Sequence, residues 1–278
     1  MLREYKEINL AYGSAMIANE IFSEEIKKED ISKLTGGGRH QSNLPLFREG
    51  ASRRVYKVTD AVLLTEFKDQ VHSNRDGFVV VKGTSIERVR IYKILNDYLT
   101  KNGVPGSAIA FYDRYVAHRN LPVSENIEVI VKTRIIGSTK HQYVGLGDVQ
   151  TRFGGYLKAN ANHRPFIRFD WRSVAGDIAL PKPLADYFID TDAASKTVYR
   201  AFRLLCERFS VCDLDLIDAC FYLTSCGRYL CVEVSPDNLG NIEYVGNATH
   251  IMQAINHKDK DRYLTKYKMI RTLLEATI

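Results

Sequence analysis

The sequence predicts an α+β fold in which antiparallel sheets are flanked by helices and arranged as two lobes. The chain has 278 residues, 45% hydrophobic and 26% charged, which is the balance of a globular protein with a large core. Short β-prone segments follow one another without a helix after each, whereas a doubly wound parallel sheet would alternate strictly. Helical periodicity is confined to a few longer segments.

The first half of the chain is expected to hold a helix, a connector, three strands and a second helix. Apolar residues between Met16 and Ile26 fall on one face of the first helix. The glycine-rich run 35–43 lacks the Gly-Lys-Ser/Thr ending of a phosphate loop, so we interpret it as a connector. β-prone segments flank a turn at Thr59-Asp60, and the second helix ends at Asn102-Gly103. The helices are expected at 14–28 and 86–102, and the strands at 54–58, 61–67 and 78–81.

The rest of the chain is expected to hold five strands and two helices. Strands are expected at 107–117, at 125–135, which is rich in Val and Ile, and at 166–170. A helix over 193–209 precedes two further strands, 211–224 and 228–234, which form a hairpin with the turn Ser225-Cys226-Gly227. A last helix runs from about 260 to 277.

Charge and cysteine content limit the class of protein. Lys and Arg number 39 against 33 Asp and Glu, a net charge of +6, and the cations are spread out, which favours small anionic substrates over nucleic acid. The odd count of five cysteines, in a chain without a signal peptide, indicates reduced thiols. The cysteines form no C-x-x-C pair, so a zinc site is not expected. No apolar run approaches the ~18 residues of a membrane span, and no signal pattern is present. We expect a soluble cytoplasmic protein.

Two acidic residues near the carboxyl end are candidate metal ligands. Asp218 lies on the first strand of the expected hairpin and Glu233 near the end of the second, so both could project from one face. Mg²⁺ prefers a few carboxylate oxygens together with substrate phosphates. Glu233 sits in an apolar run, and a buried carboxylate needs a partner such as a metal ion. A plain hairpin with solvated acidic residues is the alternative.

Two segments that carry cations are candidate anion sites. The small residues Gly50 to Ser52 let the backbone approach phosphate oxygens, and Arg53 adds positive charge. Lys132 and Arg134 share one face of a strand that leads to the turn Gly137-Ser138. Each segment alone is equally well explained as an exposed hairpin or an exposed basic strand face.

Six segments, in order, resemble motifs of the SAICAR synthetases, which are purine-pathway ligases with a two-lobed, ATP-grasp-related fold. The family's Gly-Lys-Ala-Lys-x-Val-Tyr strand is similar to residues 50–56, and its Glu-Phe-Ser-Pro-Asp is similar to residues 233–237. The resemblance begins near residue 46. The other four segments are 64–67, 102–105, 128–138 and 259–263.

The resemblance implies three parts and one reaction. The parts are an N-terminal helix with its connector at 1–45, a nucleotide-binding lobe at 46–120, and an ATP-grasp-like lobe with the metal and substrate sites at 121–278. In the implied reaction, ATP phosphorylates a carboxylic acid to an acyl phosphate, and an amine, aspartate in the family, displaces the phosphate to form an amide.

The implied cofactors are ATP and Mg²⁺. The implied partners are a small carboxylic acid and an amino acid, within purine or related heterocycle biosynthesis. We expect no nucleic-acid or membrane partner, and the resemblance is compatible with a homo-oligomer.

The resemblance also assigns roles by position. Glu233, Asp218 and Arg172 are the implied catalytic residues, with Asp218 and Glu233 holding the metal and Arg172 standing for a phosphate-contacting lysine. The implied ATP-binding residues are Gly50, Ser52, Arg53, Val55, Glu66, Arg119 and Leu121. The implied substrate-binding residues are Lys132, Arg134, Gly137, Ser138, Ser235 and Asp237.

Three departures from the family pattern concern the substrate. Ala51 replaces the first lysine of the glycine strand, and Lys132 replaces an arginine, which binds anions differently. Asn238-Leu239-Gly240 follows the Ser-Pro-Asp turn where the family has an arginine. These departures predict an altered acceptor acid. A small-molecule kinase and a non-catalytic nucleotide-binding protein on the same fold are the alternatives.

Overall fold

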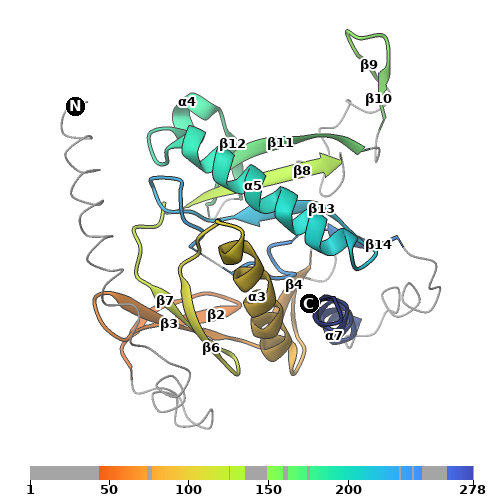
Figure 1. The fold of residues 1–278 in the computed structure, drawn as a ribbon. Coiled ribbons are helices and arrows are strands. Elements are labelled where there is room, and N and C mark those ends of the chain that lie inside the picture. Colours follow the sequence, from red (N-terminus) through yellow and green to blue (C-terminus); the bar gives the residue numbers. More distant parts are fainter. Residues whose placement is uncertain are drawn as a thin grey trace.

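Two five-stranded antiparallel sheets and three long helices form the framework of the computed structural model (Figure 1). The structure describes residues 44–73, 77–124, 126–134, 149–158, 162–173, 176–231, 233–239, 241–245 and 262–277. The helix expected at 14–28 and the connector at 35–43 lie outside the described residues. None of the described helices is long and apolar enough to cross a membrane.

The first sheet has the strand order β1-β2-β3-β7-β6. The single strand expected at 107–117 is wrong, because Asp113, with a φ of 51°, turns the chain and divides it into a hairpin. A separate small hairpin consists of β4 (Gln70–Ser73) and β5 (Gly77–Val80). The strands of the sheet are β1 (Leu46–Glu49), β2 (Arg53–Lys57), β3 (Val62–Phe67), β6 (Ala108–Tyr112) and β7 (Tyr115–Arg119).

The two faces of the first sheet have different surroundings. Tyr56 and Leu64 belong to a small apolar cluster on one face. Phe67 and Val116 belong to the main core on the other face, beside helix α3 (Thr84–Lys101). Because side chains alternate along a strand, the register assigns the residues of β2, β3 and β7 to the small cluster or to the main core.

The second sheet has the order β12-β11-β8-β13-β14, and helix α5 (Thr191–Ser210) packs on its central strands (Figure 1). The expected strand at 125–135 and the expected helix at 193–209 are confirmed. The strands are β8 (Ile127–Arg134), β11 (Asn162–Trp171), β12 (Ile178–Leu180), β13 (Leu214–Phe221) and β14 (Asn241–Tyr244). The smaller elements are β9 (Val149–Gln150), β10 (Tyr156–Leu157) and α4 (Lys182–Ala185).

The hairpin expected from 211–224 and 228–234 is wrong except at its tip. Leu223 bridges Leu230, but β13 forms its ladders with β8 and β14 instead. The returning segment leaves the sheet because Leu230 exchanges backbone hydrogen bonds of 2.7 and 3.1 Å with Ser107 and Pro105 of the first half. Gly227, with a φ of 69°, allows the tip to touch the start of α5, where a Cβ atom would lie 2.4 Å from the backbone nitrogen of Ala194.

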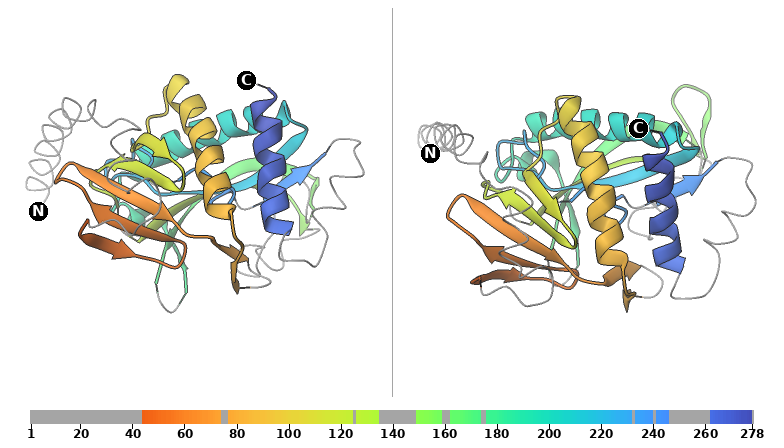
Figure 2. Two further views of the ribbon diagram at one scale, coloured as in Figure 1. Left: turned by 90° about the horizontal axis from the view of Figure 1, so that it is seen from below. Right: turned by 60° about the horizontal axis from the view of Figure 1, so that its bottom comes forward.

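One hydrophobic core connects the two sheets. Helices α3 and α7 (Arg262–Glu275) lie side by side (Figure 2), and α3 also contacts α5. The core includes Leu95 of α3, Val129 of β8, Leu205 of α5 and Leu274 of α7. The division of the chain at 120/121 therefore stays a prediction, since the lobes it would separate share their packing.

Candidate functional site

A buried, charged face of the second sheet is the main part of the candidate site. Val129 and Val131 of β8 pack in the core beneath α5, so the alternating residues Glu128 and Lys132 point to the opposite face. Charged side chains are rarely buried unless they are paired, so a strand face rich in them is informative. The buried charged residues of this face are Glu128, Lys132, Arg168, Asp170 and Asp218, each no more than 8% exposed.

Ion pairs within one strand and between neighbouring strands compensate these charges. Lys132 Nζ lies 3.1 Å from Asp218 Oδ2, on the position that faces it in β13. Arg168 Nη2 donates to Asp170 Oδ2 at 2.6 Å. Arg134 contacts Asp215 at the more exposed end of the same strands. The predicted substrate residues Lys132 and Arg134 thus share a face, and each has an acidic neighbour.

Arg172, which follows β11, lies at the edge of this face. Its Nη1 is 3.2 Å from Glu128 Oε1, and its Nε is 3.6 Å from Asp177 Oδ1. The Tyr222 side chain lies close enough to both Glu128 and Arg172 to interact with them. Burial raises the pKa of Glu128, and Arg172 offsets this only in part. Half of the Arg172 side chain is exposed, at 49%, so its guanidinium can reach a ligand.

Arg53 approaches the same region from the first sheet. It pairs with Phe67 in the β2–β3 ladder and therefore lies on the core side of that sheet, as Val55 does. Its positive charge lowers the pKa of Tyr222 and of Asp237 in the second half of the chain, against the larger opposite effect of burial on each. No ion pair or hydrogen bond of the Arg53 guanidinium is found in the part of the chain that the structure describes.

His118 is a buried neutral base on the same side of the first sheet. Burial and the charge of Arg53 lower the pKa of His118 from 6.5 to about 3. Its Nδ1 lies 3.1 Å from Ser107 Oγ, and its ring stacks on Tyr92 of α3 with centroids 6.1 Å apart. Because the ring stays uncharged at neutral pH, His118 adds no repulsion to a cation such as Arg53.

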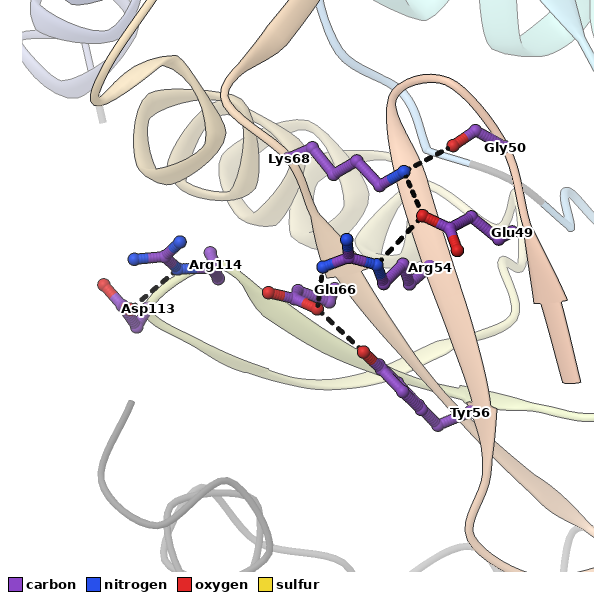
Figure 3. Close-up of polar contacts among 8 residues, drawn as sticks. All are labelled: Glu49, Gly50, Arg54, Tyr56, Glu66, Lys68, Asp113 and Arg114. Atoms are coloured by element: carbon purple, nitrogen blue, oxygen red, sulfur yellow. Dashed lines mark hydrogen bonds and ion pairs between the residues drawn. The ribbon is translucent and has the colours of Figure 1, made fainter. Parts of the chain in front are cut away.

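The glycine turn is held by a polar cluster on the other side of the first sheet (Figure 3). Lys68 Nζ donates to the carbonyl of Gly50 at 2.8 Å and to Glu49 at 2.5 Å. Glu66 accepts a hydrogen bond of 2.9 Å from the Tyr56 hydroxyl and lies 3.5 Å from Arg54.

The predicted ATP-binding residues are therefore divided between two faces of the first sheet. Glu66 and Arg119 have the register of the small apolar cluster, opposite to Arg53 and Val55. Ser52 is half-buried beside the turn, and Leu121, just after β7, is buried. Only the residues on the core side can share a ligand with Arg172.

Glu233 and Asp237 belong to a second buried network. Arg88 Nη2 of α3 lies 2.6 Å from Glu233 Oε1 and 3.0 Å from Asp237 Oδ2. The Tyr267 hydroxyl of α7 donates to Asp237 Oδ1. Ser235, between the two acidic residues, is fully buried, and its carbonyl accepts from the backbone nitrogens of the next turn. The predicted catalytic Glu233 and the predicted substrate residues Ser235 and Asp237 thus lie beneath α3 and α7.

Asp218 and Glu233 do not fit a shared magnesium site. Asp218 faces Lys132 and Asn241 in its ladders, not the segment of Glu233. Each carboxylate is already paired with a buried cation, Lys132 or Arg88. Among the described residues, no group of three or more His, Cys, Asp and Glu side chains could hold a metal ion. Oε2 of Glu233 is buried, without a hydrogen-bond partner among the described residues, and can accept from a ligand.

Sequence reasoning missed several residues of the site. Arg88 falls at helical spacing with Tyr92, Leu95 and Leu99, and a cation on that apolar face is a signal of a buried partner. The alternation of Arg168 and Asp170 with apolar residues could likewise have indicated a polar strand face. No sequence signal singles out Tyr222 or His118. The predicted Gly137 and Ser138 lie outside the described residues.

Three solved structures with a similar fold are SAICAR synthetases by name. A SAICAR synthetase in complex with ADP has a TM-score of 0.65 and 15% identity, covering 80% of this chain and 96% of that one. The SAICAR synthase from Saccharomyces cerevisiae complexed with SAICAR has a TM-score of 0.60 and 16% identity, covering 84% and 94%. The phosphoribosylaminoimidazole-succinocarboxamide synthase from Ehrlichia chaffeensis has a TM-score of 0.61 and 16% identity, covering 84% and 96%.

No protein-family model matches the sequence, and a search of curated proteins finds no significant match. At these identities the similarity concerns the fold. The predicted α+β class and the resemblance to the SAICAR synthetase fold are confirmed.

Proposed function

We propose that this protein is an ATP-dependent ligase that joins a carboxylic acid to the amine of an amino acid, as in the synthesis of SAICAR or a related heterocyclic amide. The fold of this chain is that of the SAICAR synthetases over about four fifths of its length, as the coverage of 80–84% indicates. One of those proteins is named as a complex with ADP and another as a complex with SAICAR, so the fold accommodates both kinds of ligand.

The observation that carries the proposal is that Arg172, beside Glu128 on the second sheet, and Arg53, on the core side of the first sheet, both lie close enough to Tyr222 for their charges to act on it. Arg172 from the second sheet and Arg53 from the first both lower the pKa of Tyr222, although burial raises it more. Phosphoryl transfer depends on positioning and on cations that meet the charge of the phosphates. We therefore propose that the phosphates bind at the junction of the two sheets, where each sheet supplies such a charge.

In the proposed reaction, a carboxylate oxygen of the acid attacks the γ-phosphorus of ATP and ADP leaves. The amine nitrogen then attacks the acyl carbon, inorganic phosphate leaves, and the nitrogen loses a proton to solvent. Arg53 and Arg172 neutralise charge on the phosphates. Lys132 and Arg134 hold the acid on the charged face of the second sheet. Asp218 and Asp215 offset these two cations, which supports an acceptor less strongly anionic than the ribotide of the purine pathway.

A second candidate is a non-catalytic nucleotide-binding protein. The specific observation in its favour is that both carboxylates predicted to hold Mg²⁺ are paired with buried cations. The dependence on Mg²⁺ predicted from the sequence stays a prediction.

Product analysis tests the proposal. The protein is incubated with ATP, magnesium chloride, a panel of heterocyclic acids, and aspartate or other amino acids. The proposed ligase forms ADP only when acid and amine are both present, and mass spectrometry finds the amide. ADP formed without the amine indicates a kinase. Bound ADP without turnover of any pair contradicts the ligase and supports the second candidate.

A further inference from the structure

Arg88 lies beside Glu233, one of the two residues that the sequence predicts to hold a metal ion. Its guanidinium lies between Glu233 and Asp237, with Nη2 within 3.0 Å of an oxygen of each. The Arg88 side chain is 0% exposed and the Glu233 side chain 2%. The guanidinium also lies over the ring of Phe67 at 5.0 Å, and Nη1 donates to the carbonyl of Gln70 at 3.3 Å. Arg88 is thus fixed on several sides.

The charges of this network balance without an added cation. Two carboxylates, Glu233 and Asp237, face Arg88, and Lys266 of α7 is close enough to Asp237 for the two charges to interact. The Tyr267 hydroxyl supplies a further donor to Asp237. The two acidic groups are therefore matched by at least two cations, with a smaller effect of Arg53 on Asp237, and by a hydrogen-bond donor. A divalent ion bound there would be repelled by Arg88 and would have to displace it.

We propose that Arg88 is the built-in counter-ion of Glu233 and Asp237, so that this acidic pair takes up no divalent cation and the turn at Ser235 is fixed before any ligand binds. The inference rests on the proposed function only in treating Glu233 as part of the ligand site. It is tested without nucleotide or turnover, so its failure is distinguishable from failure of the ligase proposal.

The test titrates Mn²⁺ into the full chain at pH 8. Binding is measured as the loss of the electron paramagnetic resonance signal of free Mn²⁺. Wild type and Glu233→Gln are expected to bind Mn²⁺ alike, because Glu233 holds none. Arg88→Met removes the built-in cation and is expected to gain one Mn²⁺ site. The double variant Arg88→Met/Glu233→Gln is expected to lose that gain. Arg90→Met, an exposed arginine on the same helix (55% exposed), is the matched control and should behave as wild type.

Two results would overturn the proposal. One is a wild-type Mn²⁺ affinity that falls tenfold or more in Glu233→Gln, since Glu233 would then be a metal ligand beside Arg88. The other is a folded Arg88→Met variant that binds no more Mn²⁺ than wild type. If Arg88→Met does not fold, the comparison of wild type with Glu233→Gln decides alone, and Arg88→Lys, which keeps the charge, should match wild type.

Discussion

Replacement of Arg88 by Met is expected to destabilise the protein far more than the same replacement at Arg90. Both residues lie on α3, so helix propensity changes equally in the two variants. Arg88 is fully buried with two carboxylate neighbours, and removal of one partner from a buried ion pair costs about 3–5 kcal/mol. Arg90 is 55% exposed, and its contact with Glu87 is 3.3 Å long, so its loss should change the free energy of unfolding by less than about 0.5 kcal/mol.

The assay is equilibrium unfolding in urea, followed by the fluorescence of Trp171, the single tryptophan of the chain. Its ring packs on Phe188 with centroids 5.0 Å apart, so the signal reports loss of the second sheet. Met keeps much of the apolar stem of Arg88, so the measured difference isolates the charge. Because a domain is stable by about 5–15 kcal/mol, the Arg88 variant should unfold at a clearly lower urea midpoint. A loss under about 1 kcal/mol, or equal losses in both variants, would refute the reasoning.

Three further predictions concern pH, backbone geometry and the phosphate cation. The pKa of His118 is about 3 in the folded protein against 6.5 for an ordinary histidine, so its contribution to stability is fully present above pH 6.5. Below pH 6.5 the unfolded chain gains a proton that the folded chain does not, and the free energy of unfolding should fall by up to about 1.4 kcal/mol per pH unit. In His118→Asn this slope, measured by urea unfolding from pH 8 to 5, should flatten, and an unchanged slope contradicts the assignment. Gly227→Ala should lower the free energy of unfolding by at least about 1 kcal/mol, because a Cβ atom would lie 2.4 Å from the backbone of α5. Gly154 is also at positive φ but has nothing within 4 Å of such a Cβ atom, so Gly154→Ala should lower it less in the same urea assay. Equal losses of stability would show that the close approach at Gly227 is unimportant. Arg53→Ala should lower the ligation rate, measured in a coupled ADP assay, by about 10²-fold. Arg54→Ala, on the opposite face of the sheet, should retain most of that rate. Equal effects of the two substitutions would mean that the core side does not bind ATP.

The fold could be predicted from the sequence where local patterns and packing agree. The helix at 86–102 and the strand at 125–135 have apolar residues at one regular spacing, and both are present as α3 and β8. The hairpin of 211–224 with 228–234 was wrong because a long-range contact, Leu230 with Pro105 and Ser107, competes with the local turn. A sequence pattern contains no information about such a distant backbone partner.

The candidate site could be predicted only in part, for a related reason. Residue type identified Lys132, Arg134 and Arg172 as charged groups of one region, and strand alternation placed the first two on one face. The roles of Glu233 and Asp237 depend on Arg88, which is about 145 positions away from Glu233 in sequence. Pairing over that distance follows from how α3 packs on the second half of the chain, which only the three-dimensional structure provides.

A crystal structure of the protein with ADP tests the central claim most directly, because the proposed ligase needs its nucleotide at the junction of the two sheets. We expect phosphate oxygens within hydrogen-bond distance of the guanidinium groups of both Arg53 and Arg172, with Glu66 and Arg54 on the far side of the first sheet. ADP bound on the face of Glu66, or phosphates that contact neither Arg53 nor Arg172, would contradict it.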